Sequence, residues 1–390
     1  MLSVLFLGGL LVAAFVGFNI GGSSTGVAFG PAVGSGTLST VVAAALMTGF
    51  ALLGGWTVGR NVIDTMGGEI VDPGLFTLQA SVIVLLFIGG ALLVSNLFGV
   101  PASTSMTAVG AIAGLGAARG GLHMAVLGEI VTWWLIAPLL AFWVCAVVGR
   151  YLYPYLDHYF AIDQSDGPLF EIVGGAGLPR PRLAAGTTPR EVLGSALVVV
   201  IACYMAFSAG ASNVANAVAP LVGADQLSVE AGVLLAGLSI GVGAFTIARR
   251  TLATVGSGLT DLPLLAALVV EVVSASLITF LSAIGIPASL AVSATMCIVG
   301  LGWGRATRTA SVRGAVSGEE AAAVSVNALA AEPEAEQPVP GIGEEDPAEL
   351  TASDLFDPST TGRVISLWIL TPSLAAAASY GVFTALTVIG

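Results

Sequence analysis

Four short segments place hydroxyl side chains next to glycine or proline inside otherwise apolar stretches. They span residues 21–36, 101–107, 210–220 and 287–295. A helix that breaks inside a membrane frees backbone groups that lipid cannot satisfy, so such backbone persists only where it is buried or faces a polar cavity. Helix N-termini there offer N–H donors and a partial positive charge. The pattern predicts an oxyanion site between half-helices; the alternative is that small residues only allow close helix packing.

The candidate ligands of that anion come from these four segments. They are Ser23, Ser24, Thr25, Ser103, Thr104, Ser105, Ser212, Asn213 and Ser289. Because no arginine is expected inside a span, backbone dipoles, hydroxyls and a co-transported cation must meet the anion's charge. Asn213 and Asn216 stand one turn apart with amide oxygens, and Glu271 is an acid within an apolar run. These three residues form the candidate Na⁺ or H⁺ coupling site; no cofactor other than a bound Na⁺ is expected.

The composition is that of a membrane protein. Of 390 residues, 56% are hydrophobic and 9% are charged, whereas soluble domains carry about 25% charged residues. Segments of about 20 apolar residues are the expected membrane-spanning unit. The fourth and ninth segments are short and fit half-helices or re-entrant hairpins as well as full crossings. Ten such segments are found, at about 2–19, 37–59, 75–99, 101–117, 122–148, 191–209, 226–247, 262–285, 288–303 and 364–388.

An internal repeat relates the two halves of the chain. Residues 21–34, here called the first signature, align with residues 210–223, the second signature. At an offset three residues shorter, 99–103 align with 285–289. Each half then holds five segments, and an odd number of crossings inverts the second half relative to the first. The predicted fold is an all-α polytopic membrane protein of two inverted five-segment repeats with broken or re-entrant helices.

The expected organisation follows from the repeat and the charges. The first transmembrane repeat covers 1–149, a cytoplasmic linker 150–190, and the first four segments of the second repeat 191–304. An acidic, disordered cytoplasmic loop covers 305–363, and the last helix covers 364–390. With both termini outside the cell, ten arginines lie on the cytoplasmic side and only Arg60 and Arg119 face out, as the positive-inside rule requires. The protein is therefore expected to be a multi-pass protein of the cell membrane.

At these motifs the chain resembles the inorganic phosphate transporter (PiT) family. That family carries a GANDVANA-like signature in each half, and residues 210–217 read GASNVANA while the first signature is more diverged. Residues 101–106 resemble the family's P-V-S-T-T-H motif, and Glu271 matches its glutamate in the second half. The signature aspartate is replaced by Ser24 and Asn213, and the motif histidine by Met106 and Val292.

The resemblance implies a secondary active transporter that carries inorganic phosphate across the cell membrane, coupled to Na⁺ or H⁺. The family's aspartates help to bind phosphate and the cation, so their loss leaves two alternatives open: a permease of the same fold for sulfate or another oxyanion, or an uncoupled anion channel. A membrane enzyme is disfavoured because no catalytic constellation is found. The expected partners are phosphate or a similar oxyanion, Na⁺ or H⁺, and the lipid bilayer, with no nucleic acid; a homodimer is compatible with the sequence.

Overall fold

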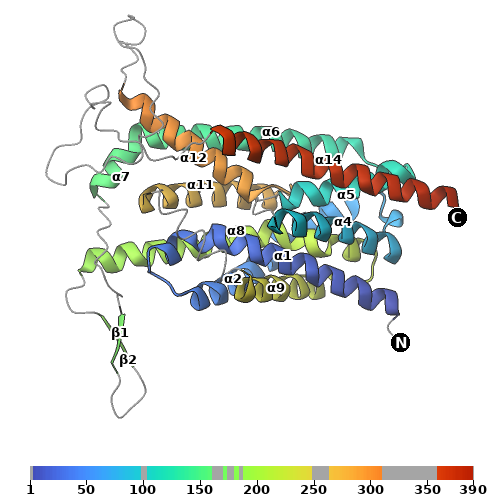
Figure 1. Cartoon of the computed structure of the whole chain (residues 1–390), viewed down its shortest axis with the longest axis horizontal. Coiled ribbons are helices and arrows are strands. Elements are labelled where there is room, and N and C mark those ends of the chain that lie inside the picture. Colours follow the sequence, from blue (N-terminus) through green and yellow to red (C-terminus); the bar gives the residue numbers. More distant parts are fainter. Residues whose placement is uncertain are drawn as a thin grey trace, which may run out of the picture.

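The described chain is almost entirely helical (Figure 1). The structure is a computed structural model, and it describes residues 3–97, 103–159, 170–173, 180–183, 188–247, 263–309 and 358–389. The fold is therefore the all-α one expected from composition. One small addition was not expected: within the linker, strands β1 (Phe170–Val173) and β2 (Arg180–Leu183) pair antiparallel and extend beyond the end of the helical bundle.

Each of the ten predicted apolar segments corresponds to one long helix. In the first half these are α1 (Val4–Gly34), α2 (Thr40–Trp56), α4 (Leu78–Leu97), α5 (Thr104–Arg119) and α6 (Met124–Val147). In the second half they are α8 (Pro189–Gly223), α9 (Val229–Thr246), α11 (Leu264–Ala283), α12 (Leu290–Ala306) and α14 (Pro358–Ile389). Short pieces connect them: α3 (Gly59–Asp64), η1 (Thr65–Glu69), η2 (Pro73–Leu75), η3 (Val148–Leu152), α7 (Tyr153–Tyr159) and η4 (Thr307–Thr309).

Length and composition let seven of the described helices cross a membrane, or eight with one bent pair counted as a span. The pair consists of Thr40–Trp56 and Gly59–Glu69, bent by 65°. Its second piece carries Arg60 next to the bend, and the expectation that no arginine lies within a span stays a prediction. Arg60 remains compatible with a membrane surface because its Nη1 lies 3.0 Å from Glu230 Oε1 and both side chains are partly exposed. The charge is paired outside the protein core.

Two helical hairpins account for the short fourth and ninth segments. The chain before α4 and the chain after α5 are joined, since Asp72 N–H donates to Gly121 O and His123 N–H donates to Ile70 O, both at 2.9 Å. Thus α4 begins and α5 ends at the same end of the bundle, near both termini (Figure 1). The α11–α12 hairpin enters from the opposite end. Since a hairpin returns to its own side, both termini still share one end and the linker lies at the other.

The His123 side chain closes the base of the α4–α5 hairpin. Its Nδ1 lies 2.7 Å from the Glu69 carbonyl oxygen and its Nε2 lies 2.9 Å from Asp72 Oδ1. Both partners accept hydrogen bonds, so the protonated imidazolium satisfies both at once. The hydrogen bond to the Glu69 carbonyl and then that to Asp72 raise the pKa of His123. The pair is exposed and adds little stability, but it fixes where the hairpin leaves the bundle.

The two signatures do not break their helices, contrary to expectation. α1 and α8 run through them without interruption, and the Thr25 hydroxyl donates to Gly21 O at 2.7 Å within α1. Glycine serves close packing instead. A Cβ at Gly21 would overlap the carbonyl oxygen of Ile240, and one at Gly210 would overlap that of Ala51. The glycines of these two segments therefore serve close helix packing rather than a helix break.

In two close crossings, a helix of one half packs against a helix of the other half. Gly21 of α1 meets Ile240 of α9, and Gly210 of α8 meets Ala51 of α2; each residue of one crossing stands 189 positions from its equivalent in the other. Two halves related by a twofold axis produce such an exchange. The complete inverted repeat stays a prediction, because residues 248–262 lie outside the described part of the chain.

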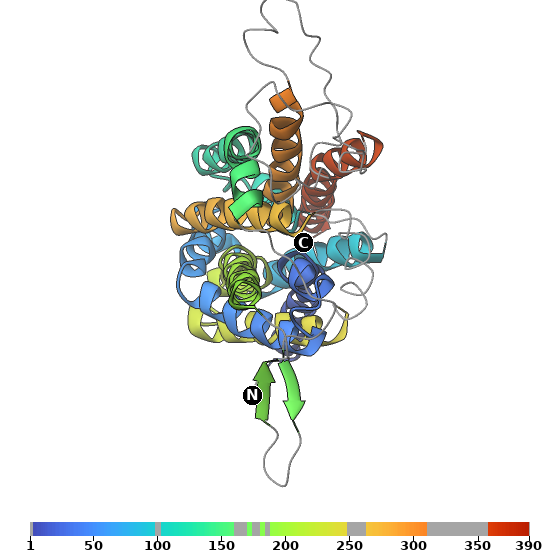
Figure 2. The same cartoon turned by 90° about the vertical axis from the view of Figure 1, so that its left-hand side faces the viewer.

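The hairpins show the same exchange. In α5, Gly114 lies against the Ala376 carbonyl of α14; in α12, Gly300 lies against the Phe142 carbonyl of α6. The last helix of each half therefore packs along the hairpin of the other half. Figures 1 and 2 show α6, α12 and α14 on one side of the bundle, with α1, α2, α8 and α9 on the other.

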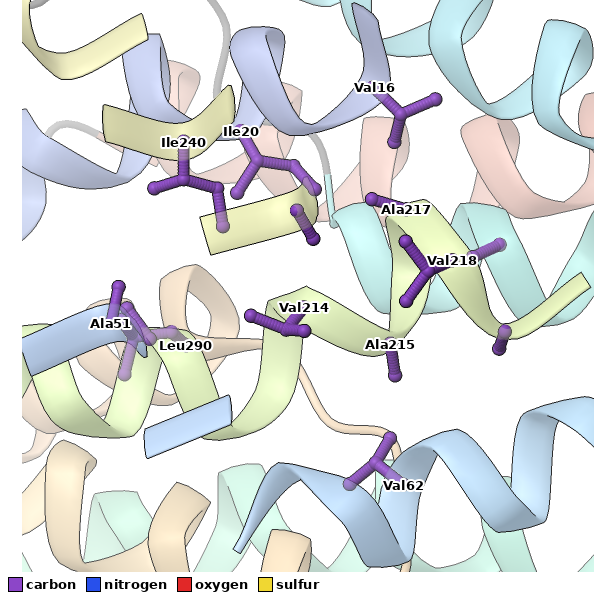
Figure 3. Close-up of a cluster of buried hydrophobic side chains, with 14 of the residues drawn as sticks. Val16, Ile20, Ala51, Val62, Val214, Ala215, Ala217, Val218, Ile240 and Leu290 are labelled. Carbon is purple, nitrogen blue, oxygen red and sulfur yellow. The ribbon is translucent and has the colours of Figure 1, made fainter. Parts of the chain in front are cut away.

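The middle of α8 is the best-buried part of the bundle. Its apolar side chains pack against neighbours from α1, α2, α3, α9 and α12 (Figure 3). The labelled residues are Val16, Ile20, Ala51, Val62, Val214, Ala215, Ala217, Val218, Ile240 and Leu290, each less than 9% exposed. Polar groups on this stretch of α8 are therefore shielded from lipid, which is the setting that a membrane-embedded site needs.

The crossing at Gly210 gives a test of the fold. Gly210→Ala should lower the thermal midpoint of the purified protein, because the new Cβ meets the Ala51 backbone and overpacking costs about 1–3 kcal/mol. Gly49→Ala is the control, since Gly49 is exposed on α2 and a Cβ there would have nothing within 4 Å. Equal midpoints for the two variants would show that α2 and α8 do not cross at Gly210.

Candidate functional site

The α5 helix begins beside the middle of α8. Ser103 is its N-cap: the Ser103 hydroxyl accepts the backbone N–H of Met106 at 3.3 Å. Serine favours this position because its side chain satisfies one of the backbone donors left free at a helix start. The remaining N–H groups of the first turn and the positive end of the helix dipole lie in the same place.

Five polar side chains meet where α5 starts, and they are here called the polar cluster. Thr104 Oγ1 donates to Asn213 Oδ1 at 2.5 Å, and Ser105 Oγ lies 3.3 Å from Ser212 Oγ. Asn216 Nδ2 is 3.1–3.3 Å from Asn213 Oδ1, Thr104 Oγ1 and Ser105 Oγ. The cluster thus joins the first hairpin to the second signature, two segments about 110 residues apart in the chain.

The polar cluster is electrically neutral, and all of its side chains except the half-buried Thr104 are buried. Ser105, Ser212 and Asn216 are fully buried. All five side chains are hydroxyls or amides, which both donate and accept hydrogen bonds without carrying a charge. One acceptor in it, Asn216 Oδ1, has no partner. Next to a helix N-terminus, such a set of donors suits an anion that brings its own charge.

The tip of the second hairpin lies against the same stretch of α8. Ser212 Oγ donates to Ala288 O at 2.6 Å, and Trp134 Nε1 donates to Pro287 O at 2.8 Å. Ser289 then caps α12 by accepting the Val292 N–H at 3.3 Å. Ser289 is therefore adjacent to the polar cluster through Ala288, and α12 starts as α5 does, with a capping serine.

The hydrogen bonds described for the first signature run within α1 and not to the polar cluster. Ser23 donates to the carbonyls of Asn19 and Ile20, and Thr25 bonds within α1. Ser24 is partly buried. Sequence reasoning missed a polar pair here: Asn96 Nδ2 lies 3.1 Å from Asn19 Oδ1. The sequence could have indicated this pair, because both residues are asparagines within apolar segments.

The two halves differ in polarity at equivalent positions. Thr104 and Ser105 correspond by the repeat to Leu290 and Ala291, and Asn216 corresponds to Val27. Three of the five cluster residues therefore have apolar equivalents, whereas Ser212 and Asn213 correspond to the hydroxyl residues Ser23 and Ser24. The polar cluster as described joins the first hairpin to the second signature.

Glu271 lies apart from the asparagine pair. Ser208 Oγ donates to Ala275 O at 3.0 Å, which places that turn of α11 beside Ser208 of α8. Glu271 lies one turn before Ala275, and Asn213 lies five residues after Ser208, so the separation is roughly 13 Å along the axes. The carboxylate is 4% exposed and neither oxygen has a hydrogen-bond partner. The structure places the three candidate coupling residues at two locations, and within its described part no His, Cys, Asp and Glu residues group as metal ligands.

Known proteins of similar sequence and structure are carriers of oxyanions by name. The profile described as the phosphate transporter family matches residues 20–379. The sulfate permease CysP of Bacillus subtilis (strain 168) is 31% identical over 300 residues, covering 76% of this chain and 77% of that protein. The chloroplastic inorganic phosphate transporter 2-1 of Arabidopsis thaliana is 25% identical over 360 residues, covering 76% and 65% respectively.

A solved structure shares the fold. The structure titled "The sodium-dependent phosphate transporter" superposes with a TM-score of 0.69 over 100% of both chains, at 17% sequence identity. At this identity the likeness shows the fold alone.

A substitution in the polar cluster tests whether it binds an anion. Ser105→Ala should weaken phosphate and sulfate binding by roughly tenfold, because an oxygen atom of a buried anion loses a donor. Ser35→Ala is the control: Ser35 follows α1 and its hydroxyl bonds to Ala32 O and Thr37. Equilibrium binding of labelled anions measures both. Equal, small losses at the two positions would mean that Ser105 serves packing.

Proposed function

The chain belongs to the phosphate transporter family, and from that membership we propose that it carries inorganic phosphate across the cell membrane by secondary active transport. It is a multi-pass membrane transporter and not an enzyme. The observation that carries the substrate proposal is the polar cluster: buried neutral donors at the N-terminus of α5, next to a second helix start at α12.

The chemistry of the cluster suits a tetrahedral anion that must also leave again. A buried arginine would hold the anion by charge, and releasing it would leave an unpaired charge in the protein. Hydroxyls such as those of Thr104 and Ser105 can instead return to each other and to the asparagines when the anion departs. The described contacts within the cluster are then the resting arrangement of the same groups.

We propose that the two hairpins move in alternation. The hairpin tips, where α5 and α12 begin, reach α8 from opposite ends of the bundle. In the helix crossings on either side, a helix of one half packs against a helix of the other half. Two related halves around one site can take up mirrored arrangements, which open the site first to one side and then to the other. The linker end is proposed to face the cytoplasm, because Arg150, Arg305 and Arg308 lie there.

Sulfate is a second candidate substrate, favoured by two observations. The sulfate permease CysP is 31% identical, and the cluster contains no carboxylate. Phosphate at neutral pH keeps a proton that needs an acceptor, whereas sulfate has none and needs donors alone. The unpartnered Asn216 Oδ1 supports phosphate, because it could accept a hydrogen bond from the protonated phosphate oxygen.

Uptake by proteoliposomes decides between the substrates. We expect labelled phosphate to accumulate under an imposed gradient of Na⁺ or H⁺, with unlabelled sulfate competing poorly. Stronger uptake of sulfate, unaffected by excess phosphate, would assign the second substrate. Protein-free liposomes of the same lipid composition are the control for leak. If neither anion accumulates, transport of these oxyanions is disproved.

The coupling cation is proposed to be Na⁺ or H⁺, with Glu271 as its ligand or carrier. A carboxylate inside a membrane protein is costly unless it is protonated, paired or metal-bound. No described basic side chain bonds to Glu271, and both of its oxygens are unpartnered. Na⁺ is favoured by the name of the solved relative with the same fold. Asn213 and Asn216 would then act on the anion side rather than with Glu271.

Glu271→Gln separates the two cations. If Na⁺ binds there, the variant should need a higher Na⁺ concentration for half-maximal uptake, because a neutral amide replaces a carboxylate. If a proton is carried, pH-driven accumulation should disappear while exchange of internal for external anion continues. Unchanged accumulation with either gradient would assign Glu271 a structural role and favour an uncoupled anion channel. Val272→Gln is the matched control, since Val272 is exposed on the same turn of α11.

A further inference from the structure

Trp368 of α14 carries a buried donor that has no hydrogen-bond partner in the part of the chain that the structure describes. The residue is 7% exposed, and its Nε1 atom is buried without a hydrogen-bond partner. An indole N–H can donate but never accept. Buried donors are nearly always paired in folded proteins, so an unpaired one calls for a reason.

The equivalent tryptophan in the first half does have a partner. Trp134 stands four residues before Pro138 in α6, as Trp368 stands four residues before Pro372 in α14. Trp134 Nε1 donates to Pro287 O, at the tip of the second hairpin. Since α6 packs along α12 as α14 packs along α5, Trp368 occupies beside α5 the place that Trp134 occupies beside α12.

The Trp368 ring lies where the two half-helices start. It packs in one cluster with Met106 and Val292, and Trp134 contacts the same cluster. Met106 and Val292 are each the third residue after a capping serine. Met106 directly follows Ser105 of the polar cluster. The indole is therefore held within one helical turn of the groups that form the candidate anion site.

We propose that the Trp368 N–H donates a hydrogen bond to the transported oxyanion. Trp368 is thus a binding residue supplied by the last helix of the second half, added to hydroxyls from the first hairpin and the second signature. The inference rests on the proposed function, since it requires an anion at the start of α5. It explains why the Trp368 N–H has no partner among the described residues: its acceptor is the substrate.

The role has a consequence for movement. A bound anion would connect α14 to α5 and α8 at once, whereas Trp134 connects α6 to the second hairpin with or without substrate. Contacts that form only with substrate bias the equilibrium between conformations. Trp368 would then tighten the packing of α14 on the first hairpin only in the loaded carrier.

Trp368→Phe tests the inference, because it removes the N–H and keeps an aromatic ring. In proteoliposomes, the KM for phosphate or sulfate should rise about tenfold while the maximal rate changes little. The thermal midpoint without anion should stay near that of the wild type, and its increase on adding phosphate should shrink. Trp134→Phe is the matched control: it loses an existing bond, so its midpoint should fall even without anion.

A second measurement reports the bond itself. The six tryptophans of the ¹⁵N-labelled protein in nanodiscs give indole N–H signals, and the signal missing in Trp368→Phe belongs to Trp368. Phosphate or sulfate should move that signal downfield. Wild-type uptake combined with an unchanged KM in Trp368→Phe and an unmoved signal would overturn this inference alone. Failure of the wild-type protein to transport either anion would overturn the proposed function and this inference together.

Discussion

Lipid offers no hydrogen-bond partner, so the polar groups that this protein buries must find one within the protein or in a bound ligand. That constraint explains why the two hairpins meet at α8. A helix that starts inside the bundle leaves N–H groups free, and each hairpin begins its second limb with a capping serine, Ser103 or Ser289. The carbonyls at the second tip are taken by Ser212, Trp134 and Asn61. The site exists because interrupted backbone needs such partners, and a substrate can take the place of some of them.

Close helix crossings make this arrangement possible. The hairpin tips reach the middle of α8 only if the neighbouring helices stand near enough to exclude lipid there. Glycine permits this at Gly21 and Gly210, where any side chain would meet a carbonyl oxygen of the crossing helix. Helix packing therefore positions the polar side chains: the crossings fix where α8 lies, and α8 places Ser212, Asn213 and Asn216 beside the start of α5.

Sequence reasoning succeeded where the physics is local. The starts of α5 and α12 follow from a proline and a serine close together in the chain, and the ten long helices follow from hydropathy. It failed at the signatures, because glycine with small hydroxyls suits a helix break and a close crossing equally well. The choice depends on the partner, and Gly210 finds its partner at Ala51, about 160 residues away in the chain. The separation of Glu271 from Asn213 was invisible for the same reason: it depends on which turns of α8 and α11 lie side by side.

The two halves share the features that hold the hairpins in place, but they differ in the polar side chains at the hairpin tips. Capping serines, glycine crossings and tryptophan positions recur in both, and these are the features that hold the hairpins in place. Three polar groups of the cluster do not recur, since Leu290, Ala291 and Val27 stand where Thr104, Ser105 and Asn216 stand in the equivalent set. A second buried set of donors would need partners of its own, and a less polar second tip avoids that cost. In the proposed alternating mechanism, the related helices supply the symmetry between two states, and the polar cluster departs from that symmetry because one anion needs one set of donors.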